Sequence, residues 1–251
     1  MPVLAPGDAA RATRRAIVSN GVSAHLSTFI GSNRYMASAE PPPGPEAVYP
    51  MAFLVEQPPG SVVDAHFHEA NQFQIVVAGS GTLGTHALAP IAVHYSNAFS
   101  AYGPITAGEA GLHYLTLRNG YDRGARYLPA AREELRGVQR RFRQATAGPV
   151  PPASSATEAL LEAAPDGMAA WRHRLPPGAA LEGPDPAEGD GQFWVVTEGE
   201  LQAADGTTLP ALSCAFVGPA EPPFAVTAGA AGLELVVVQY PRGRAHVPAA
   251  G

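Results

Sequence analysis

Residues Gly60 to Gly79 read GSVVDAHFHEANQFQIVVAG, and this stretch decides both the fold and the chemistry that the sequence predicts. His66 and His68 are two residues apart on a predicted strand, so both imidazoles point to the same face. Gln72 opens the next predicted strand, and a hairpin of the two strands brings its amide to the imidazoles. Two neutral ring nitrogens and an amide oxygen suit a divalent first-row metal ion that keeps open coordination positions.

The same stretch belongs to an internal repeat. The block AFLVEQPPG ends at Gly60, and the block AWRHRLPPG ends at Gly178. In the same way, QFQIVVAG begins at Gln72 and QFWVVTEG begins at Gln192. A third pair of blocks, AGEAGLHYLTLR and AGAAGLELVVVQ, follows in the same order. The chain is therefore predicted to be a tandem duplication.

Each half is predicted to be an all-β fold of short antiparallel strands. Runs such as QFQIVVAG, PIAVHYS and LHYLTLR are separated by turns, and the chain of 251 residues holds 27 Gly and 26 Pro. This pattern is typical of an antiparallel barrel or sandwich. Between the halves, residues 129–146 carry Leu135, Val138 and Phe142 at helical spacing among many arginines, which predicts one helix. A Pro/Ala-rich linker is expected from Ala147 onward.

The motif resembles the first motif of the cupin superfamily, which runs Gly, five residues, His-x-His, three or four residues, Glu, six residues, Gly. Here it stands as Gly60, His66, His68, Gln72 and Gly79, with Gln in place of Glu. Together with the repeat, the resemblance implies a bicupin, in which two tandem antiparallel jelly-roll barrels are joined by a helix and a Pro/Ala linker. It also implies one divalent Fe, Mn, Ni or Zn ion in the first barrel.

The predicted organisation has four parts: an N-terminal extension (1–49), an N-terminal cupin barrel with the metal site (50–128), an Arg-rich helix with the linker (129–157) and a degenerate C-terminal cupin barrel (158–251). In the second half, Pro184 and Pro186 stand where His66 and His68 stand in the first. We therefore expect no metal site there, and interpret the second barrel as a structural partner or a metal-free ligand pocket.

Two further residues are candidates for the site. Cupins usually add a histidine ligand from a second motif, which is not legible in this sequence. Tyr102 stands where that histidine would be sought, and we expect it to donate a hydrogen bond to a substrate or to act as an acid or base. His94 shares a strand face with Ala92 and Ser96, so it points into a polar lumen or into solvent. It is a candidate for the fourth metal ligand and for an acid/base role.

The composition excludes several kinds of function. The sequence contains no Lys, so all 16 cationic residues are Arg, which excludes a lysine Schiff base and a Walker-type phosphate lysine. The net charge of −6 disfavours a nucleic-acid partner. Cys214 is the single cysteine, which excludes an internal disulfide and a multi-cysteine metal site. With no long apolar run and no signal-peptide core, we expect a cytoplasmic monomer or homodimer without a membrane partner.

The ligand set predicts the class of substrate. Because His66, His68 and Gln72 are neutral, a bound divalent ion keeps its full formal charge, which favours a small anionic oxygenated substrate. The sequence therefore predicts a metal-dependent enzyme of small-molecule metabolism, of the dioxygenase, isomerase or lyase type, acting in the N-terminal barrel. The alternative is a non-catalytic bicupin that binds or senses a small ligand, because the cupin ligand set is incomplete.

Overall fold

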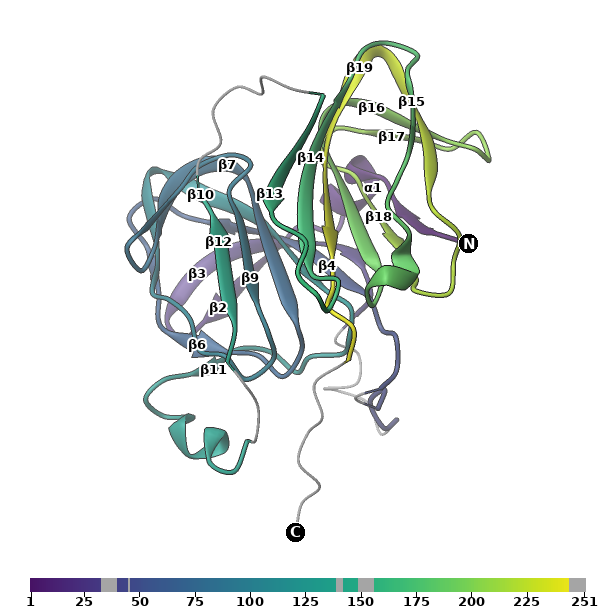
Figure 1. The fold of residues 1–251 in the computed structure, drawn as a ribbon. Helices are drawn as coiled ribbons and strands as arrows, with labels where there is room; N and C mark the ends of the chain where they lie inside the picture. The colour runs from purple at the N-terminus through teal and green to yellow at the C-terminus, as the bar shows by residue number, and fades with distance from the viewer. Residues whose placement is uncertain (33–39, 45, 139–141, 149–155, 244–251) are drawn as a thin grey trace. The chain divides into compact units, whose positions relative to one another are not determined.

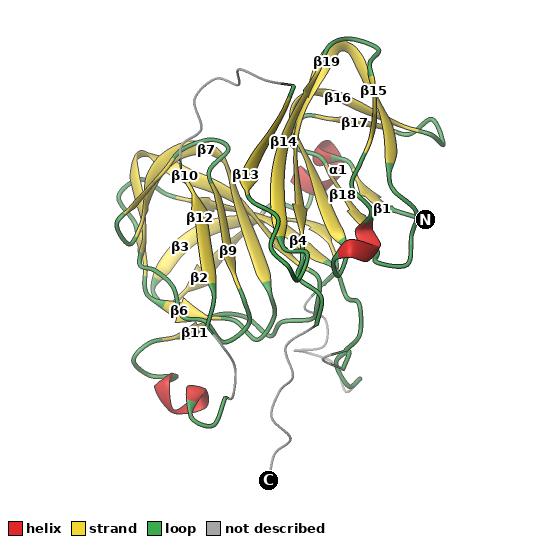
Figure 2. Ribbon diagram, in the orientation of Figure 1, coloured by secondary structure: helices red, strands yellow, loops and turns green. Residues whose placement is uncertain are grey.

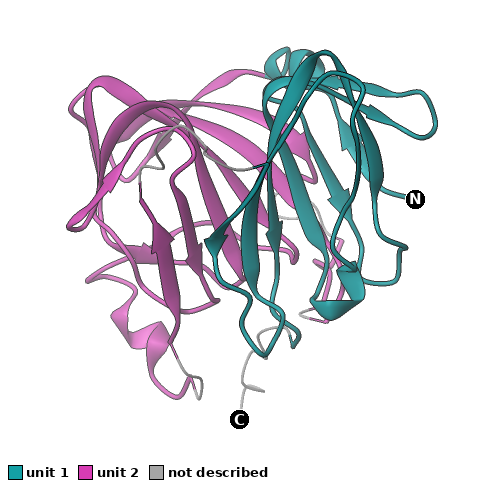
Figure 3. Cartoon of the chain, turned by 45° about the horizontal axis from the view of Figure 1, so that its top comes forward, with its two compact units in different colours: residues 1–13, 150–243 teal, residues 14–149, 244–251 magenta. Residues whose placement is uncertain are grey.

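The computed structural model describes residues 1–32, 40–44, 46–138, 142–148 and 156–243. The chain divides into two compact units, coloured separately in Figure 3: unit 1 contains residues 1–13 and 150–243, and unit 2 contains residues 14–149. Both units consist almost wholly of antiparallel strands (Figures 1 and 2), which confirms the all-β prediction. In the described ranges, no helix has the length and apolar character needed to cross a membrane.

Unit 2 holds most of its strands in one sheet. Its elements are, in chain order, β2 (Arg15–Ser19), β3 (Val22–Ile30), β4 (Met51–Gln57), β5 (Val62–Val63), β6 (His66–Phe67), β7 (Gln72–Leu83), β8 (His86–Leu88), β9 (Val93–Ser96), β10 (Ile105–Arg118), β11 (Arg126–Tyr127), the 3-10 helix η2 (Arg132–Leu135) and β12 (Gln144–Ala147). The nine-stranded sheet has the order β12-β9-β7-β10-β4-β3-β2, with β5 paired to β10 and β8 paired to β7. A separate pair is formed by β6 and β11.

Unit 1 forms an eight-stranded sheet. Its elements are β1 (Val3–Ala5), α1 (Gly7–Arg11), β13 (Thr157–Leu161), β14 (Ala169–Leu175), β15 (Ala180–Glu182), the 3-10 helix η3 (Pro186–Glu188), β16 (Gln192–Ala203), β17 (Thr208–Pro210), β18 (Cys214–Val217) and β19 (Ala225–Gln239). The sheet has the order β1-β18-β16-β19-β14-β13, with β15 paired to β19 and β17 paired to β16.

The two units repeat one strand pattern, which confirms the predicted duplication. The order β9-β7-β10-β4 in unit 2 is the same as the order β18-β16-β19-β14 in unit 1. Gln72 at the start of β7 pairs with Arg118 at the end of β10. Gln192 at the start of β16 pairs with Gln239 at the end of β19. The QF blocks of the sequence repeat therefore lie on equivalent strands in the same register.

A glycine in each long strand permits a close crossing of the backbone. Gly79 in β7 and Gly199 in β16 have positive φ angles of 74° and 72°. A Cβ atom would lie 2.2 Å from the Gly111 carbonyl oxygen at the first position and 2.1 Å from the Gly232 carbonyl oxygen at the second. Only glycine fits both the space and the backbone conformation. Gly79, the last residue of the cupin-like motif, is therefore required by the fold.

The residues predicted to form a helix, 129–146, fold differently in their described part. They form the short 3-10 helix η2 and then β12, which pairs with β9. Gly137 has a φ of 80°, which breaks a helix, while Leu135 packs on a small apolar cluster. The edge of β9 supplies backbone partners to the following residues, so a strand replaces the helix. Residues 139–141, and most of the predicted linker at 149–155, lie outside the described residues.

The predicted N-terminal extension, residues 1–49, contributes strands to both units. β1 pairs with β18 in unit 1, whereas β2 and β3 extend the sheet of unit 2 beyond β4. The turn between β2 and β3 is Asn20-Gly21, with φ angles of 47° and 79°. Two consecutive positive φ angles are what a two-residue type I′ hairpin requires, and Asn-Gly is its preferred sequence. This local preference explains why the segment forms a hairpin.

Candidate functional site

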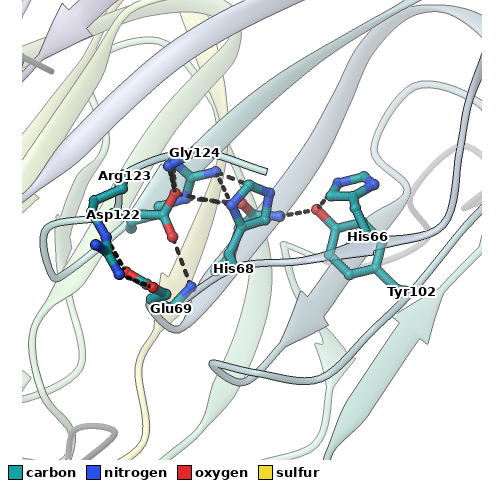
Figure 4. Close-up of polar contacts among 9 residues, drawn as sticks. His66, His68, Glu69, Tyr102, Asp122, Arg123 and Gly124 are labelled. Carbon is teal, nitrogen blue, oxygen red and sulfur yellow. Dashed lines mark hydrogen bonds and ion pairs between the residues drawn. The ribbon is translucent and has the colours of Figure 1, made fainter. Parts of the chain in front are cut away.

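His66 and His68 lie close together in unit 2, where both side chains are buried (Figure 4). His66 opens the short strand β6, and His68 follows directly after it. The centroids of their rings are 5.2 Å apart, and the rings are nearly perpendicular. The backbone of His66 exchanges two hydrogen bonds with that of Tyr102, of 3.0 and 2.9 Å. This bridge holds the imidazole pair next to the Tyr102 side chain.

The Nδ1 atom of each imidazole is held by an acceptor. Nδ1 of His66 lies 2.7 Å from the carbonyl oxygen of Asp64, and Nδ1 of His68 lies 2.9 Å from a carboxylate oxygen of Asp122. Burial opposes the charged form of Asp122, but Arg118 and His68 hold the pKa of this carboxyl group below its ordinary value. A carbonyl oxygen and an ionised carboxylate can accept a hydrogen bond but cannot donate one, so Nδ1 of each ring carries the proton and Nε2 keeps its lone pair. This is the tautomer that binds a metal ion through Nε2.

The Nε2 atoms and the Gln72 oxygen receive donors from within the protein. The Tyr102 hydroxyl lies 3.0 Å from Nε2 of His66. Nη2 of Arg118 lies 3.1 and 3.2 Å from the two ring nitrogens of His68, of which only Nε2 can accept. Nε of Arg118 donates to Oε1 of Gln72 at 2.9 Å, and Nε2 of Gln72 donates to the Tyr102 hydroxyl at 2.6 Å. These side chains form one hydrogen-bonded network.

Arg118 and Asp122 are site residues that the sequence analysis does not identify. Arg118 ends β10 and is buried, and its guanidinium lies 3.1 Å from the Asp122 carboxylate. The same guanidinium lies 5.1 Å from the centroid of the Phe53 ring. Asp122 is completely buried and also accepts the backbone N–H of Glu69 at 2.8 Å. The sequence signal for the pair is an arginine that ends the apolar run LHYLTLR, with an aspartate four residues later.

Burial sets the protonation states of the site. It lowers the pKa of His66 to about 3. Burial, together with the nearby Arg118, also lowers the pKa of His68 below its ordinary value. Burial raises the pKa of Tyr102 above its ordinary value. Near neutral pH the site therefore contains two neutral imidazoles, a neutral phenol, and the cationic guanidinium of Arg118 paired with the ionised carboxylate of Asp122.

His94 lines a different, smaller cavity than the imidazole pair. It is opposite Gln74 in the β7–β9 register, and its Nδ1 lies 3.0 Å from Oε1 of Gln74. The His94 ring packs on the Tyr102 ring, with 4.7 Å between the centroids. The structure thus brings His66, His68 and Tyr102 together and sets His94 against the tyrosine. In the part of the chain that the structure describes, no three His, Cys, Asp or Glu side chains are grouped closely enough to hold a metal ion.

A cavity of about 220 Å³ opens beside these side chains. Its polar lining residues include His66, His68, Gln72, Tyr102, Thr116 and Arg118. Its apolar lining residues include Ile17, Val22, Ala24, Leu26, Phe53 and Val55. The cavity therefore has a polar side around the histidines and an apolar side built by β2, β3 and β4.

In unit 1 the equivalent space is filled. Trp194, which takes the position of Gln74 in the repeat, is completely buried and packs edge-on against Phe224 at 5.2 Å. Its Nε1 donates to Oε1 of Gln192 at 3.0 Å. Gly183 makes room for the indole, because a Cβ atom there would lie 2.1 Å from the Trp194 ring. A large apolar side chain thus occupies the interior where unit 2 has its polar side.

Comparisons with known proteins identify relatives in fold. No protein-family model matches the chain, and no curated protein sequence matches it. Among solved structures, the chain is similar to the pirin YhhW of Escherichia coli in complex with nickel(II). The two share 10% sequence identity over 96% of this chain and 100% of the pirin, with a TM-score of 0.57.

Two other solved structures show the same likeness. A protein of Nostoc punctiforme described as a candidate dioxygenase shares 12% identity over 99% of this chain and 85% of its own, with a TM-score of 0.61. Oxalate decarboxylase of Bacillus subtilis, studied for its Mn(II) centres, shares 13% identity over 97% of this chain and 78% of its own, with a TM-score of 0.55. The neighbours are cupin-fold proteins, and oxalate decarboxylase is a bicupin.

Proposed function

The chain has a bicupin fold, and from this premise we propose that unit 2 is a metal-dependent enzyme or ligand-binding unit for small molecules, centred on His66 and His68. The observation that carries the proposal is the orientation of the imidazoles. Both Nδ1 atoms are held by acceptors, so both Nε2 atoms keep their lone pairs, and these contact the Tyr102 hydroxyl and the Arg118 guanidinium of one polar network. Nickel in the pirin and Mn(II) in oxalate decarboxylase support a divalent first-row metal ion. The reaction types proposed are dioxygenation, isomerisation and lyase chemistry.

The residues present fit such an ion. Neutral imidazole nitrogens bind Fe, Mn, Ni and Zn, so His66 and His68 would hold the ion, with the Gln72 amide beside them. When bound, the ion supplies Lewis-acid or redox chemistry to a substrate. Binding requires the protein to give up two hydrogen bonds, from Tyr102 to His66 and from Arg118 to His68. The released hydroxyl and guanidinium then become donors for a bound ligand.

A second candidate function, a metal-free ligand-binding unit, is favoured by the same network. The acceptor atoms of His66, His68 and Gln72 that face the site already have donors within the chain. A polar network that is satisfied in this way is stable without a metal ion. The two functions differ in one measurable property, the metal content of the purified protein.

Metal content tests the proposed function. Protein purified without chelator is expected to contain about one divalent ion per chain, measured by plasma mass spectrometry. The double variant His66→Ala/His68→Ala should lose the ion. The matched variant His86→Ala/His113→Ala, which removes an exposed and a half-buried histidine, should retain it. Metal retained by the first variant contradicts the assignment, and wild-type protein that binds no added ion leaves the metal-free candidate.

A further inference from the structure

We propose that the pocket of unit 2 takes a small apolar carboxylate, which is a single ring or short hydrocarbon chain that carries one carboxylate group. This inference rests on the proposed function, because it names the class of ligand for the same site. Three observations support the inference: the cavity has an apolar and a polar side, the Arg118 guanidinium lines the polar side, and the cavity is small.

The apolar side is built by the N-terminal strands. Ile17 of β2 and Val22, Ala24 and Leu26 of β3 line the cavity, as does Phe53 of β4. A purely polar anion would leave these side chains in contact with trapped water. A hydrocarbon body covers them, and removing apolar surface from water favours binding. The cavity therefore selects a ligand with an apolar body.

The polar side offers hydrogen-bond donors and the guanidinium of Arg118, whose ion-pair partner Asp122 is not among the residues that line the cavity. Arg118 is the only formally charged side chain among the described residues that line the cavity. Its contacts with Gln72, His68 and Asp122 occupy three of the five guanidinium N–H groups. The remaining N–H groups are donors that match a carboxylate, and the Tyr102 hydroxyl joins them when a bound ion takes its place at Nε2 of His66. A cationic ligand would meet the guanidinium and no carboxylate.

The size of the cavity limits the ligand. Its volume of about 220 Å³ is below the roughly 300–1,000 Å³ of clefts that hold drug-sized molecules. One ring or a short chain with a single head group suits this space. The sequence predicts a small anionic substrate, and the cavity adds to this prediction that the substrate has an apolar hydrocarbon part.

The apolar side is held in place next to the histidines. The Asn20 side chain donates to the Asp64 carboxylate at 2.9 Å, and the Ser19 hydroxyl lies 2.8 Å from the Tyr127 hydroxyl. The Tyr127 ring in turn lies 5.4 Å from the His66 ring. The tip of the β2–β3 hairpin is therefore tied to the residues that position the imidazoles, so the two sides of the cavity are kept together.

Three probe molecules test the class of ligand by calorimetric titration of the full-length protein, both chelator-treated and metal-loaded. Benzoate has the ring and the carboxylate, benzyl alcohol has the ring alone, and acetate has the carboxylate alone. Benzoate is expected to bind at least about tenfold more tightly than either of the others. Equal affinity for acetate contradicts the apolar body, and equal affinity for benzyl alcohol contradicts the carboxylate.

Two variants of β3 locate the binding. Ala24→Phe places a ring in the cavity and should weaken benzoate binding at least about tenfold. Ser23→Phe alters the neighbouring exposed residue and should leave the affinity unchanged. Thermal melts verify that both variants fold. If Ala24→Phe does not fold, Leu26→Phe places a ring in the cavity at a second position instead. Equal benzoate affinity in Ser23→Phe and in the folded variant with a ring in the cavity overturns the inference.

The metal measurement keeps this inference separate from the proposed function. Ala24→Phe should bind the same amount of metal as the wild type, because Asp64 and Asp122, not Ala24, hold the two imidazoles. A protein that binds metal but prefers acetate to benzoate overturns the ligand class alone. A protein that binds benzoate in the cavity but no metal ion overturns the metal-dependent function and supports the ligand class.

Discussion

Gln72 joins two neighbouring strands through its side chain, because Arg118 of β10 donates to its amide oxygen at 2.9 Å. An equivalent link between strands occurs in unit 1 with the direction of donation reversed, because Gln192 donates to the amide oxygen of Gln239 at 2.8 Å. Unit 1 lacks the two histidines, so a glutamine at this position is sufficient to link the strands without any metal site. The Gln72 amide therefore has a structural role in addition to its place beside His66 and His68.

Replacement of Gln72 by Glu separates these two roles. A carboxylate adds Coulombic attraction, so the affinity for a divalent ion is expected to rise about tenfold in Gln72→Glu. Benzoate binding should weaken, because the new carboxylate repels the anion and pairs with Arg118. Metal titration and calorimetry measure the two effects, which have opposite signs. Gln192→Glu is the matched control, in which an unpaired buried carboxylate costs a few kcal/mol of stability and leaves metal binding unchanged.

The protonation of His94 predicts how stability depends on pH. Burial lowers the pKa of His94 from its ordinary value of 6.5 to about 4. Below about pH 6.5 the unfolded chain takes up a proton at this residue, whereas the folded chain does so only near pH 4. The stabilisation is therefore complete above pH 6.5 and is lost as the pH falls toward 4.

Urea unfolding between pH 7 and pH 4 checks this dependence. The free energy of unfolding of the wild type is expected to fall by up to about 3 kcal/mol through His94 alone, with further losses from the other buried histidines. His94→Gln keeps a polar side chain but cannot titrate, so its stability should fall less steeply. Parallel curves for the two proteins would show that His94 does not contribute.

The imidazole pair and Gln72 can be predicted from sequence because they lie within one short stretch with a specific spacing. Tyr102 follows from the position of the second motif in the resemblance. Arg118 and Asp122 cannot be found in this way, since β10 meets β7 only through long-range strand pairing. Their contacts depend on register, which the local sequence does not specify.

The β2–β3 hairpin is a short element with a strong sequence signal. The segment IVSNGVSA has Asn-Gly between apolar runs, which is the preferred pattern of a two-residue hairpin. In residues 129–146, by contrast, helical spacing is overridden by Gly137 and by the edge of β9. In both cases the backbone conformation of one glycine decides the element.

Substitution of Gly21 tests the turn assigned to the β2–β3 hairpin. Gly21 has a φ of 79° and no atom within 4 Å of its would-be Cβ, so Gly21→Ala adds strain without a clash. We expect a loss of about 1–2 kcal/mol in the free energy of unfolding, measured in urea. Gly44→Ala is the control, because its Cβ also meets nothing within 4 Å and its φ lies outside the left-handed region. Equal effects of the two substitutions would contradict the assigned turn.

At the scale of the whole molecule, the sequence repeat predicts two similar halves, but not which residues complete each of them. Residues 1–13 belong to unit 1, although residues 14–149 of unit 2 separate them from the rest of that unit. The strand that makes this link, Val3–Ala5, is too short to be recognised by periodicity. Its partner is the edge of β18, which only the folded unit presents.

Deletion of residues 1–13 should therefore destabilise the distant half of the chain. It removes the pairing of β1 with β18 and the hydrogen bond from the Gly7 N–H to the Ser213 hydroxyl, of 2.9 Å. We expect unit 1 to lose about 2 kcal/mol or more. Amide hydrogen exchange followed by mass spectrometry should show faster exchange in β18 and β16. Exchange in β7 and β10 should be unchanged, and uniform exchange across both units would contradict the assignment.

The buried indole of Trp194 makes tryptophan fluorescence a probe of unit 1. The chain has two tryptophans, Trp171 and Trp194, and both belong to unit 1. Their fluorescence emission therefore reports the environment of that unit alone, while far-ultraviolet circular dichroism sums the strands of both. When the two signals are followed in one denaturation experiment, transitions that do not coincide measure the stability of each unit separately, without any added label.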